Sequence, residues 1–379
     1  MQPRLERRLS VPAGRRTLVA VLSIAAALVL GAVFLVLAGF SPVVVYSEMF
    51  RAAFTSYYGI TDSLAVAIPI ILTGLAAAAA FRMRLYNIGA EGQLYVGAIF
   101  STWAALAIAP GLPAPVAIVI VLAFGALGGA VWILVPALAR AYLGTSEIIT
   151  TLLLNFVALY LMRYLIYGSA SYWRDPASTN FPQGKPIPEE AYLPVFGLTR
   201  IHLGLGVALL AAALLWALLS RTRFGYDVRV VGDSEAAAWY AGIPIARTVV
   251  VVMLISGALA GLAGAGEVAG IAHALDPNGL AVNFGYTGII VAALARSNPL
   301  VVVAVAVLLG GLQNAGTALQ SIPGGGGVPV EVSFMLQGLI LLCALAGELF
   351  VLYRLRLRRV APEEIAEERP DGAPEGART

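Results

Sequence analysis

Long apolar stretches alternate with short polar gaps along most of this chain. A helix needs about 20 apolar residues to cross the core of a bilayer, and most of the stretches have that length. The stretch at 284–295 is shorter and rich in glycine, a pattern typical of a broken or half-spanning helix. The pattern predicts an all-α polytopic membrane protein with about ten transmembrane helices, at residues 17–40, 63–81, 88–108, 115–139, 147–167, 201–220, 249–272, 284–295, 299–319 and 333–352.

The basic residues are concentrated in alternate gaps between these stretches. Short cytoplasmic loops retain Lys and Arg, whereas translocated loops do not. With the N-terminus in the cytoplasm, most of the chain's 24 basic residues lie on the cytoplasmic side. This distribution predicts that both termini are cytoplasmic and that the protein lies in an inner membrane. The exceptions, near or beyond the outer face, are Arg51, Arg163, Arg174, Lys185 and Arg200.

The composition, 60% hydrophobic and 12% charged, excludes an ordinary soluble domain. The net charge of +3 follows the topology, so it gives no support for nucleic-acid binding. One cysteine, Cys343, and two histidines, His202 and His273, are too few to indicate a metal site. We therefore predict a basic cytoplasmic N-terminus at 1–16, a transmembrane domain at 17–352 and a disordered cytoplasmic tail at 353–379.

An outer insertion at 168–200 contains five prolines and several aromatic residues. One interpretation is an irregular loop whose aromatic side chains rest on lipid headgroups. The other is a docking surface for an extracytoplasmic partner, because long loops with their own aromatic residues are usually functional. The aromatic residues are Tyr172, Trp173, Phe181, Tyr192 and Phe196.

An inner insertion at 221–248 contains a short amphipathic stretch at 234–241. Asp233 or Ser234 can cap the start of a helix there, and Glu235 then lies in its first turn, where negative charge suits the helix dipole. A glycine and a proline end the stretch. A short capped helix of this kind suits insertion into a cytoplasmic protein, and the alternative is a plain interfacial helix.

A weak internal repeat joins the two halves of the chain. Residues 87–92 and 283–288 both have the pattern N-[IF]-G-x-x-G and both open an apolar stretch, and Pro115 and Pro299 each begin the next one. The second copy opens five stretches after the first, so it is inverted in the membrane. Inverted repeats with broken helices are typical of transporters. Chance matching is the alternative, because the chain contains 40 glycines.

Polar residues interrupt the apolar stretches in two main groups. The second group, Glu147, Thr151 and Asn155, recurs every four residues and therefore shares one face of a helix. Intramembrane polar side chains usually face the protein interior or a water-filled path, and their alternative role is hydrogen bonding between helices. Candidates for lining a pathway are Asn87, Glu91, Gln93, Glu147, Thr151 and Asn155.

Further polar residues lie near the outer ends of later stretches. Gln313 and Asn314 form a third group together with Gln337. Glu267 is either buried and paired or near the outer mouth, and the sequence does not decide between these positions.

Familiar catalytic motifs are missing from the sequence. The phosphate-binding pattern G-x-x-x-x-G-K-[ST] does not occur, and neither do G-x-S-x-G or H-E-x-x-H. We expect no catalytic residue, no metal and no bound cofactor in this chain. If ATP energises its activity, a separate polypeptide binds the nucleotide.

Four sequence segments together resemble the permease subunits of bacterial ABC importers. They are FRMRLYNIGAEGQLYVGA, GTSEIITTLLLN, VGDSEAAAWYAGI and GYTGIIVAALARSNPL. The relevant branch handles branched-chain amino acids, ribose-type sugars and nucleosides, and the segments look most like nucleoside or simple-sugar permeases. The resemblance extends from about residue 60 to 350 and implies that 17–352 is a permease domain.

The resemblance also implies partners. The insertion at 221–248 would be the segment that couples the permease to an ABC ATPase subunit, although its glycine falls later than usual in such segments. A second permease chain, identical or paralogous, and an extracytoplasmic solute-binding protein would complete the importer. The residues that match the coupling segment are Asp233, Glu235, Ala236, Ala237 and Gly242.

The expected function is passage of a small neutral, hydroxyl-rich solute through the membrane, without covalent catalysis. An ion-coupled secondary transporter is the main alternative, but the segment at 221–248 and the lack of a cluster of ion-binding carboxylates oppose it. A membrane-embedded enzyme lacks a reaction centre here. A non-transporting scaffold leaves the polar stripe at 147–155 unexplained.

Overall fold

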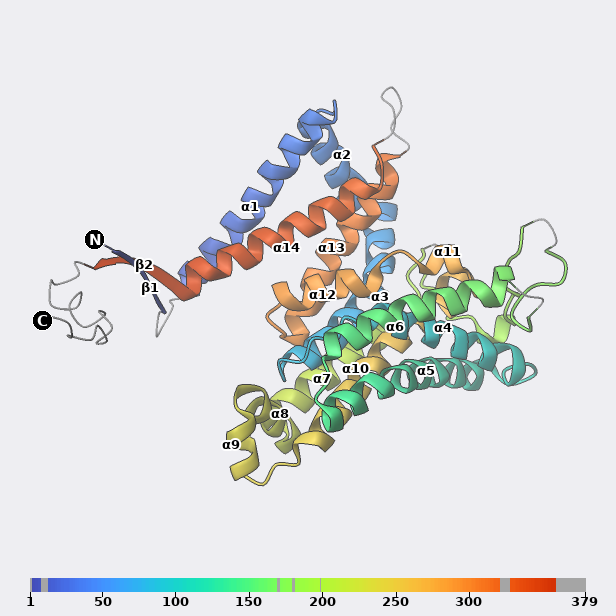
Figure 1. The fold of residues 1–379 in the computed structure, drawn as a ribbon. Helices are drawn as coiled ribbons and strands as arrows, with labels where there is room; N and C mark the ends of the chain where they lie inside the picture. The colour runs from blue at the N-terminus through green and yellow to red at the C-terminus, as the bar shows by residue number, and fades with distance from the viewer. Residues whose placement is uncertain are drawn as a thin grey trace, which may run out of the picture. The chain divides into compact units, whose positions relative to one another are not determined.

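The computed structural model (Figure 1) describes residues 2–7, 13–168, 171–178, 181–197, 199–320 and 328–358. The chain divides into two compact units, Leu35–Gly338 and a unit formed by the two terminal regions. The predicted tail beyond residue 358 lies outside the described residues, as do residues 8–12 of the predicted N-terminal segment.

Helices make up most of the larger unit (Figure 1). Two π-helical turns, η1 (Tyr164–Gly168) and η3 (Val268–Ala272), extend α6 and α10, and a 3-10 turn, η2 (Glu189–Ala191), lies in the outer insertion. The helices are α2 (Pro42–Phe54), α3 (Tyr57–Phe81), α4 (Ala90–Ala107), α5 (Ala114–Leu143), α6 (Glu147–Arg163), α7 (Gly204–Arg221), α8 (Arg223–Asp233), α9 (Glu235–Tyr240), α10 (Ile245–Glu267), α11 (Pro277–Leu280), α12 (Phe284–Leu294) and α13 (Pro299–Leu319).

The terminal unit holds most of α1 (Ala13–Leu37) and of α14 (Glu331–Leu352), which both continue into the larger unit. Gly347 of α14 lies against Ser23 and Val19 of α1. Strand β1 (Gln2–Arg7) pairs antiparallel with strand β2 (Tyr353–Arg358). The sequence analysis did not anticipate this short strand pair, which lies outside the helical architecture. The sequence YRLRLR alternates apolar and basic residues with period two, which is the pattern of a strand.

Each of the ten predicted apolar segments coincides with a helix, which confirms the all-α, polytopic membrane architecture. Three further helices, α2, α8 and the short α11, were missing from the prediction. Helix α2 carries Glu48 and Arg51, and α8 is polar on one face, so neither is a continuous apolar run. Among the described residues, six helices are long and apolar enough to cross a membrane, or seven if α1 and α2 form one bent span. The figure of about ten crossings therefore remains a prediction.

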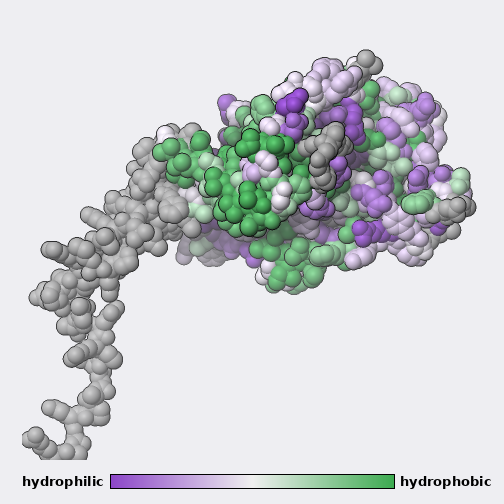
Figure 2. Space-filling model, turned by 90° about the horizontal axis from the view of Figure 1, so that it is seen from above, coloured by the Kyte–Doolittle hydropathy of each residue, from purple (hydrophilic) through white to green (hydrophobic). Residues whose placement is uncertain are grey.

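The membrane-length helices differ in how much of each is covered by protein. The apolar window of α3 is 83% buried and that of α10 is 67% buried, whereas those of α6 and α7 are 22% and 28% buried. Large apolar side chains on the outer helices, such as Leu153 and Leu214, remain exposed. Figure 2 shows such hydrophobic surface covering a broad part of the face it presents. Helices α3 and α10 thus form the core, and α6 and α7 present apolar surface suited to lipid.

Glycines set the spacing of the helices around α10. Gly261 and Gly257 of α10 lie directly against Gly125 and Gly129 of α5, and Gly97 of α4 also contacts Gly261. Because glycine has no side chain, the backbones approach closely, which is how helices commonly associate in membranes. A methyl group at position 261 would lie 2.8 Å from the Gly129 nitrogen and would overlap the Gly125 carbonyl oxygen.

We predict that Gly261→Ala destabilises the protein, whereas Gly266→Ala on the same helix does not. Overpacking at 261 should lower the free energy of unfolding by about 1–3 kcal/mol. Position 266 has open space around it, so alanine there should be neutral or stabilising by up to about 1 kcal/mol. The measurement is the fraction of monodisperse protein that survives heating in detergent. Equal melting temperatures for the two variants would contradict this packing.

Candidate functional site

The first copy of the N-[IF]-G-x-x-G pattern begins at a buried asparagine. The Asn87 side chain donates to Ser256 Oγ at 2.8 Å, and its oxygen accepts from the Gly89 N–H at 2.9 Å. Gln93 Nε2 also donates to Asn87 Oδ1 at 2.9 Å. Ser256 in turn donates to the Ala76 carbonyl at 2.6 Å. These bonds join the start of α4 to α10 and α3.

Asn155 of α6 holds the same turn from the other side. Its Oδ1 accepts from the Gly92 N–H at 2.9 Å, and its Nδ2 donates to the Ile88 carbonyl at 2.9 Å and lies 3.2 Å from the Tyr286 hydroxyl of α12. Gly92 lies directly against Asn155 because it has no side chain. The side-chain oxygen and nitrogen of Asn155 are therefore both bonded to residues at or next to the starts of two short helices, α4 and α12.

Glu91 connects the two copies of the repeated pattern. Its carboxylate accepts from the Tyr95 hydroxyl at 2.6 Å and from the backbone N–H of Gly285, in the first turn of α12. A side chain on Gly285 would collide with the backbone of Ala90 and Glu91. The carboxyl group therefore lies at the positive end of the α12 dipole.

Glu147 lies at the inner end of the polar stripe, at the start of α6. One carboxylate oxygen accepts from the Tyr86 N–H at 3.1 Å, and the other is 3.4 Å from Arg140 Nε. Thr151, one turn later, donates to the Glu147 carbonyl at 2.6 Å. Glu147 thus ties α6 to α5 and to the turn before α4.

The structure brings all six predicted pathway residues into one buried, hydrogen-bonded group, and we call this group the polar junction. Its members are between 0 and 7% exposed. Asn87, Glu91, Glu147 and Asn155 bond to other elements, whereas Gln93 bonds to Asn87 and Thr151 bonds within its own helix. Their role in a pathway remains a prediction. The sequence analysis missed Ser256, Tyr95 and Tyr286 as partners, although Ser256 is the only hydroxyl residue in the apolar run at 249–267. The polar junction consists of Asn87, Glu91, Gln93, Glu147, Thr151 and Asn155.

The inner insertion folds as two helices, α8 and α9, and the predicted capped helix is confirmed as α9. Ser234 caps it by accepting from the Ala237 N–H at 3.2 Å. Gly242, just after the helix, has a φ of 72°, a backbone conformation that favours glycine. Trp239 and Tyr240 project from the end of α9, 71% and 84% exposed.

Ion pairs fasten the two inner helices to the membrane helices. Asp233 lies 3.3 Å from Arg84, after α3, and Glu235 lies 3.7 Å from Arg140 of α5. Arg140 also pairs with Glu147. The start of α9 is thereby linked to the polar junction through the guanidinium group of Arg140.

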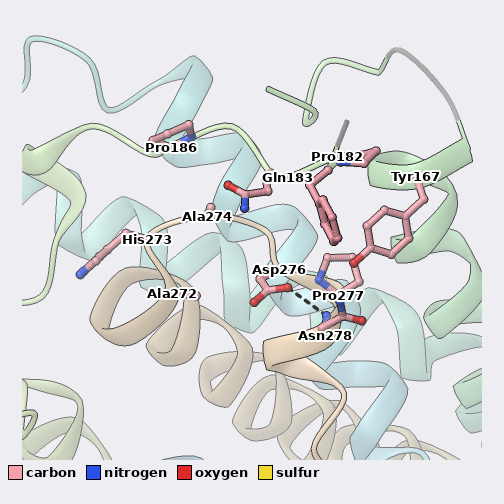
Figure 3. Close-up of a pocket in the computed structure, with 12 residues that line it drawn as sticks. Tyr167, Pro182, Gln183, Pro186, Ala272, His273, Ala274, Asp276, Pro277 and Asn278 are labelled. Atoms are coloured by element: carbon pink, nitrogen blue, oxygen red, sulfur yellow. Dashed lines mark hydrogen bonds between the residues drawn. The ribbon is translucent and has the colours of Figure 1, made fainter. Parts of the chain in front are cut away.

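The outer insertion is folded back onto the end of α10. The Lys185 N–H donates to the Trp173 carbonyl at 2.7 Å, and the Ile187 N–H donates to the His273 carbonyl at 2.9 Å. Figure 3 shows the open space beside this loop, with the His273 side chain pointing away from it. The cavity has a volume of about 800 Å³, and its lining includes Tyr167, Phe181, Gln183, Asp276 and Asn278. A concave, mixed surface of this kind is compatible with the docking interpretation, and the structure does not test it.

A buried histidine supports the outer loop just before α7 begins. His202 is fully buried; its Nδ1 accepts from the Gly204 N–H at 3.1 Å, and its Nε2 has no partner among the described residues. Burial, and to a smaller extent the nearby His273, lowers the pKa of His202 to about 4. The imidazole is therefore neutral at pH 7.

Comparisons with known proteins agree on one class. The sequence profile of a family described as branched-chain amino acid transport system / permease component matches residues 59–345. The chain is 35% identical to the glucose ABC transporter permease protein TsgB13 of Haloferax volcanii, over 93% of each chain. It is 33% identical to the guanosine ABC transporter permease protein NupP of Bacillus subtilis, over 86% of this chain and 92% of the relative. A nucleoside ABC transporter permease protein of Lactococcus lactis, NupB, is 30% identical over 84% of this chain and 87% of the relative.

We predict that Asn155→Ala destabilises the protein by about 1–3 kcal/mol, because the buried Gly92 N–H and Ile88 carbonyl lose their partner. Thr150→Ala is the control, since the neighbouring Thr150 hydroxyl bonds only within its own helix, 3.1 Å from the Ser146 carbonyl. The measurement is thermal unfolding in detergent. Equal melting temperatures for the two variants would show that the Asn155 amide does not stabilise the polar junction.

We also predict that His202 makes the protein less stable in acid. The unfolded state, with a pKa near 6.5, binds a proton before the native state does, so stability is full above about pH 6.5 and falls towards pH 4. The loss is at most about 1.4 kcal/mol for each pH unit. His202→Gln should reduce the slope of melting temperature against pH over this interval. An unchanged slope would show that the pKa of His202 is not lowered in the native protein.

Proposed function

The chain belongs to the branched-chain amino acid transport system permease family, and from this premise we propose that it forms the membrane passage of an ATP-driven importer for a nucleoside or simple sugar. The substrate class is supported by the names of the relatives, which include a glucose and a guanosine permease. Permease subunits of this kind are not themselves enzymes, so ATP hydrolysis is assigned to a separate subunit. The proposed location is the bacterial cytoplasmic membrane.

The observation that carries the proposal is the exposed end of α9. Nearly all of Trp239 and Tyr240 is accessible, and the rings meet edge to face with centroids 5.2 Å apart. Exposed neighbouring aromatic residues are typical anchors of protein interfaces. Asp233 and Glu235 form ion pairs with Arg84 and Arg140, and these pairs connect the start of α9 to the membrane helices. We assign Asp233, Glu235, Ala236, Ala237 and Gly242 to the surface that contacts an ABC ATPase subunit.

The polar junction supplies the second part of the proposal. A change in the position of α9 acts on Arg140, and Arg140 contacts Glu147 directly. The junction holds the starts of α4 and α12, so movement there would alter the passage between the two halves of the chain. We propose that the polar junction borders the passage and that a second permease chain completes it. An extracytoplasmic binding protein would deliver the solute to the outer surface.

The ion-coupled alternative is less well supported. The three relatives compared above are named as permease proteins of ABC transporters. The ABC importer is therefore the function that we propose.

We predict that the double variant Trp239→Ala/Tyr240→Ala loses its ATPase partner. Removing a pair of interface anchors typically costs about 2 kcal/mol or more, which corresponds to about thirty-fold weaker binding. The measurement is the amount of nucleotide-binding subunit that co-purifies with the full-length chain from its native membrane in mild detergent.

The matched control for this experiment is Tyr57→Ala/Tyr58→Ala. These two rings form a similar exposed edge-to-face pair, 5.6 Å apart, at the predicted outer end of α3. The control should retain the ATPase subunit. Purification of the unaltered chain without any nucleotide-binding subunit would contradict the importer, and equal loss in both double variants would contradict docking at α9.

A further inference from the structure

A second, smaller cavity lies at the predicted outer side of the larger unit. It has a volume of about 270 Å³ and is bounded by α3, the end of α10, α13 and the start of α12. Thr317 and Arg200 are exposed at its edge, whereas Glu267, Gln313 and Phe284 are buried within it. Its size suits a small molecule and not a protein segment.

Glu267 distinguishes this cavity from an ordinary gap between helices. Its side chain lines the cavity although the residue is only 8% exposed. The carboxyl group forms no hydrogen bond and no ion pair within 4 Å in the described part of the chain, and the charged side chain that acts on it electrostatically is Arg200, at the exposed edge of the cavity. Buried polar groups nearly always have a partner, and an acidic residue within a membrane span is usually functional. The expected partner is therefore a donor group that enters the cavity.

Gln313 provides a second acceptor in the same place. Its Nε2 donates to the Val282 carbonyl at 3.2 Å, so the amide is held with its nitrogen towards the backbone. Its Oε1 is buried and has no hydrogen-bond partner among the described residues. The buried part of the cavity thus offers acceptors on two side chains and needs donors to satisfy them.

The remaining lining narrows the chemistry of the ligand. Arg200 contributes a fixed positive charge at the edge, and Phe284 contributes an aromatic surface. Arg200 and Glu267 carry opposite charges when both are ionised, so together they give no net preference for a solute of either sign. A neutral solute with several hydroxyl groups and an apolar ring face satisfies the acceptors and packs against the aromatic side chain.

Accepting the proposed function, we propose that this cavity is a solute-binding site of the permease and that Glu267 and Gln313 bind hydroxyl groups of a nucleoside or simple sugar. The site adjoins the polar junction, because Phe284 immediately precedes Gly285, whose N–H is bonded to Glu91. Occupation of the cavity would therefore be sensed at the first turn of α12. Glu267 is thereby assigned to the outer mouth of the passage.

The test uses the single native cysteine, Cys343, which is replaced by alanine in the full-length chain. Thr317→Cys is then introduced at the cavity edge, and the complete transporter is kept in its native membrane. A membrane-impermeant maleimide is applied from outside, with guanosine or D-glucose as the protecting probe. Uptake of the same two radiolabelled solutes is measured in parallel, so that transport and site occupancy are read separately.

At a probe concentration about ten times its Kd, alkylation of position 317 should slow about tenfold. Adding Glu267→Gln should raise the concentration needed for half-protection about tenfold, because one of the two carboxyl oxygens is replaced by an NH2 group that cannot accept a hydrogen bond. Glu48→Gln is the matched control, since Glu48 lies on α2 in an exposed pair with Arg51, and it should leave protection unchanged. Val66→Cys, also in the cavity lining, provides a second labelling position if the variant at 317 does not reach the membrane.

The outcomes separate the two proposals. Uptake of a probe without protection at either cysteine would overturn the site and leave the importer in place. Protection that is unchanged by Glu267→Gln would remove Glu267 from the site. Lack of ATP-dependent uptake of both probes by the unaltered transporter would overturn the proposed substrate class, and the site with it.

Discussion

The structure depends on one constraint, which is that backbone N–H groups buried in an apolar medium need acceptors. The first turn of any helix leaves such groups unpaired. Helices α4 and α12 both begin inside the larger unit, and polar side chains from elsewhere complete their first turns. Asn155 accepts from Gly92 at the start of α4, and Glu91 accepts from Gly285 at the start of α12. Two interrupted helices are thus stable within the bundle because each start receives an acceptor from a neighbouring element.

This constraint explains why the same few residues appear both structural and functional. The polar junction is held by contacts among α3, α4, α6, α10 and α12, so displacement of any one of these helices disturbs several bonds. Arg140 extends the set to α9 through Glu147 and Glu235. A contiguous set of contacts is a geometric condition for coupling between sites, and only a perturbation experiment measures the coupling itself. The arrangement nevertheless identifies Arg140 as the residue through which a force on α9 reaches the membrane helices.

Local pattern was sufficient for most of the helices and for the capped helix α9. Runs of apolar residues locate membrane helices, and Ser234 is recognisable as a helix N-cap from its residue type alone. Helix α2 was missed because Glu48 and Arg51 interrupt its apolar face, and the strand pair β1–β2 was missed because pairing joins opposite ends of the chain. The residues of the polar junction were recognised as polar exceptions. Their partners were not, since the bond between Glu91 and Gly285 spans 194 positions and depends on how the helices pack.

Two glutamates show how environment, and not residue type, assigns a role. Glu91 and Glu267 are both buried in membrane helices, and burial of an unpaired carboxylate is unfavourable. Glu91 receives a tyrosine hydroxyl and a helix N-terminus, so its acceptors are satisfied by the protein itself. Glu267 has a cavity in place of such partners. A buried carboxyl group therefore stabilises the architecture at Glu91 and remains available to a solute at Glu267. Helix α12 lies between the two, because its first residue, Phe284, lines the cavity and its second, Gly285, bonds to Glu91.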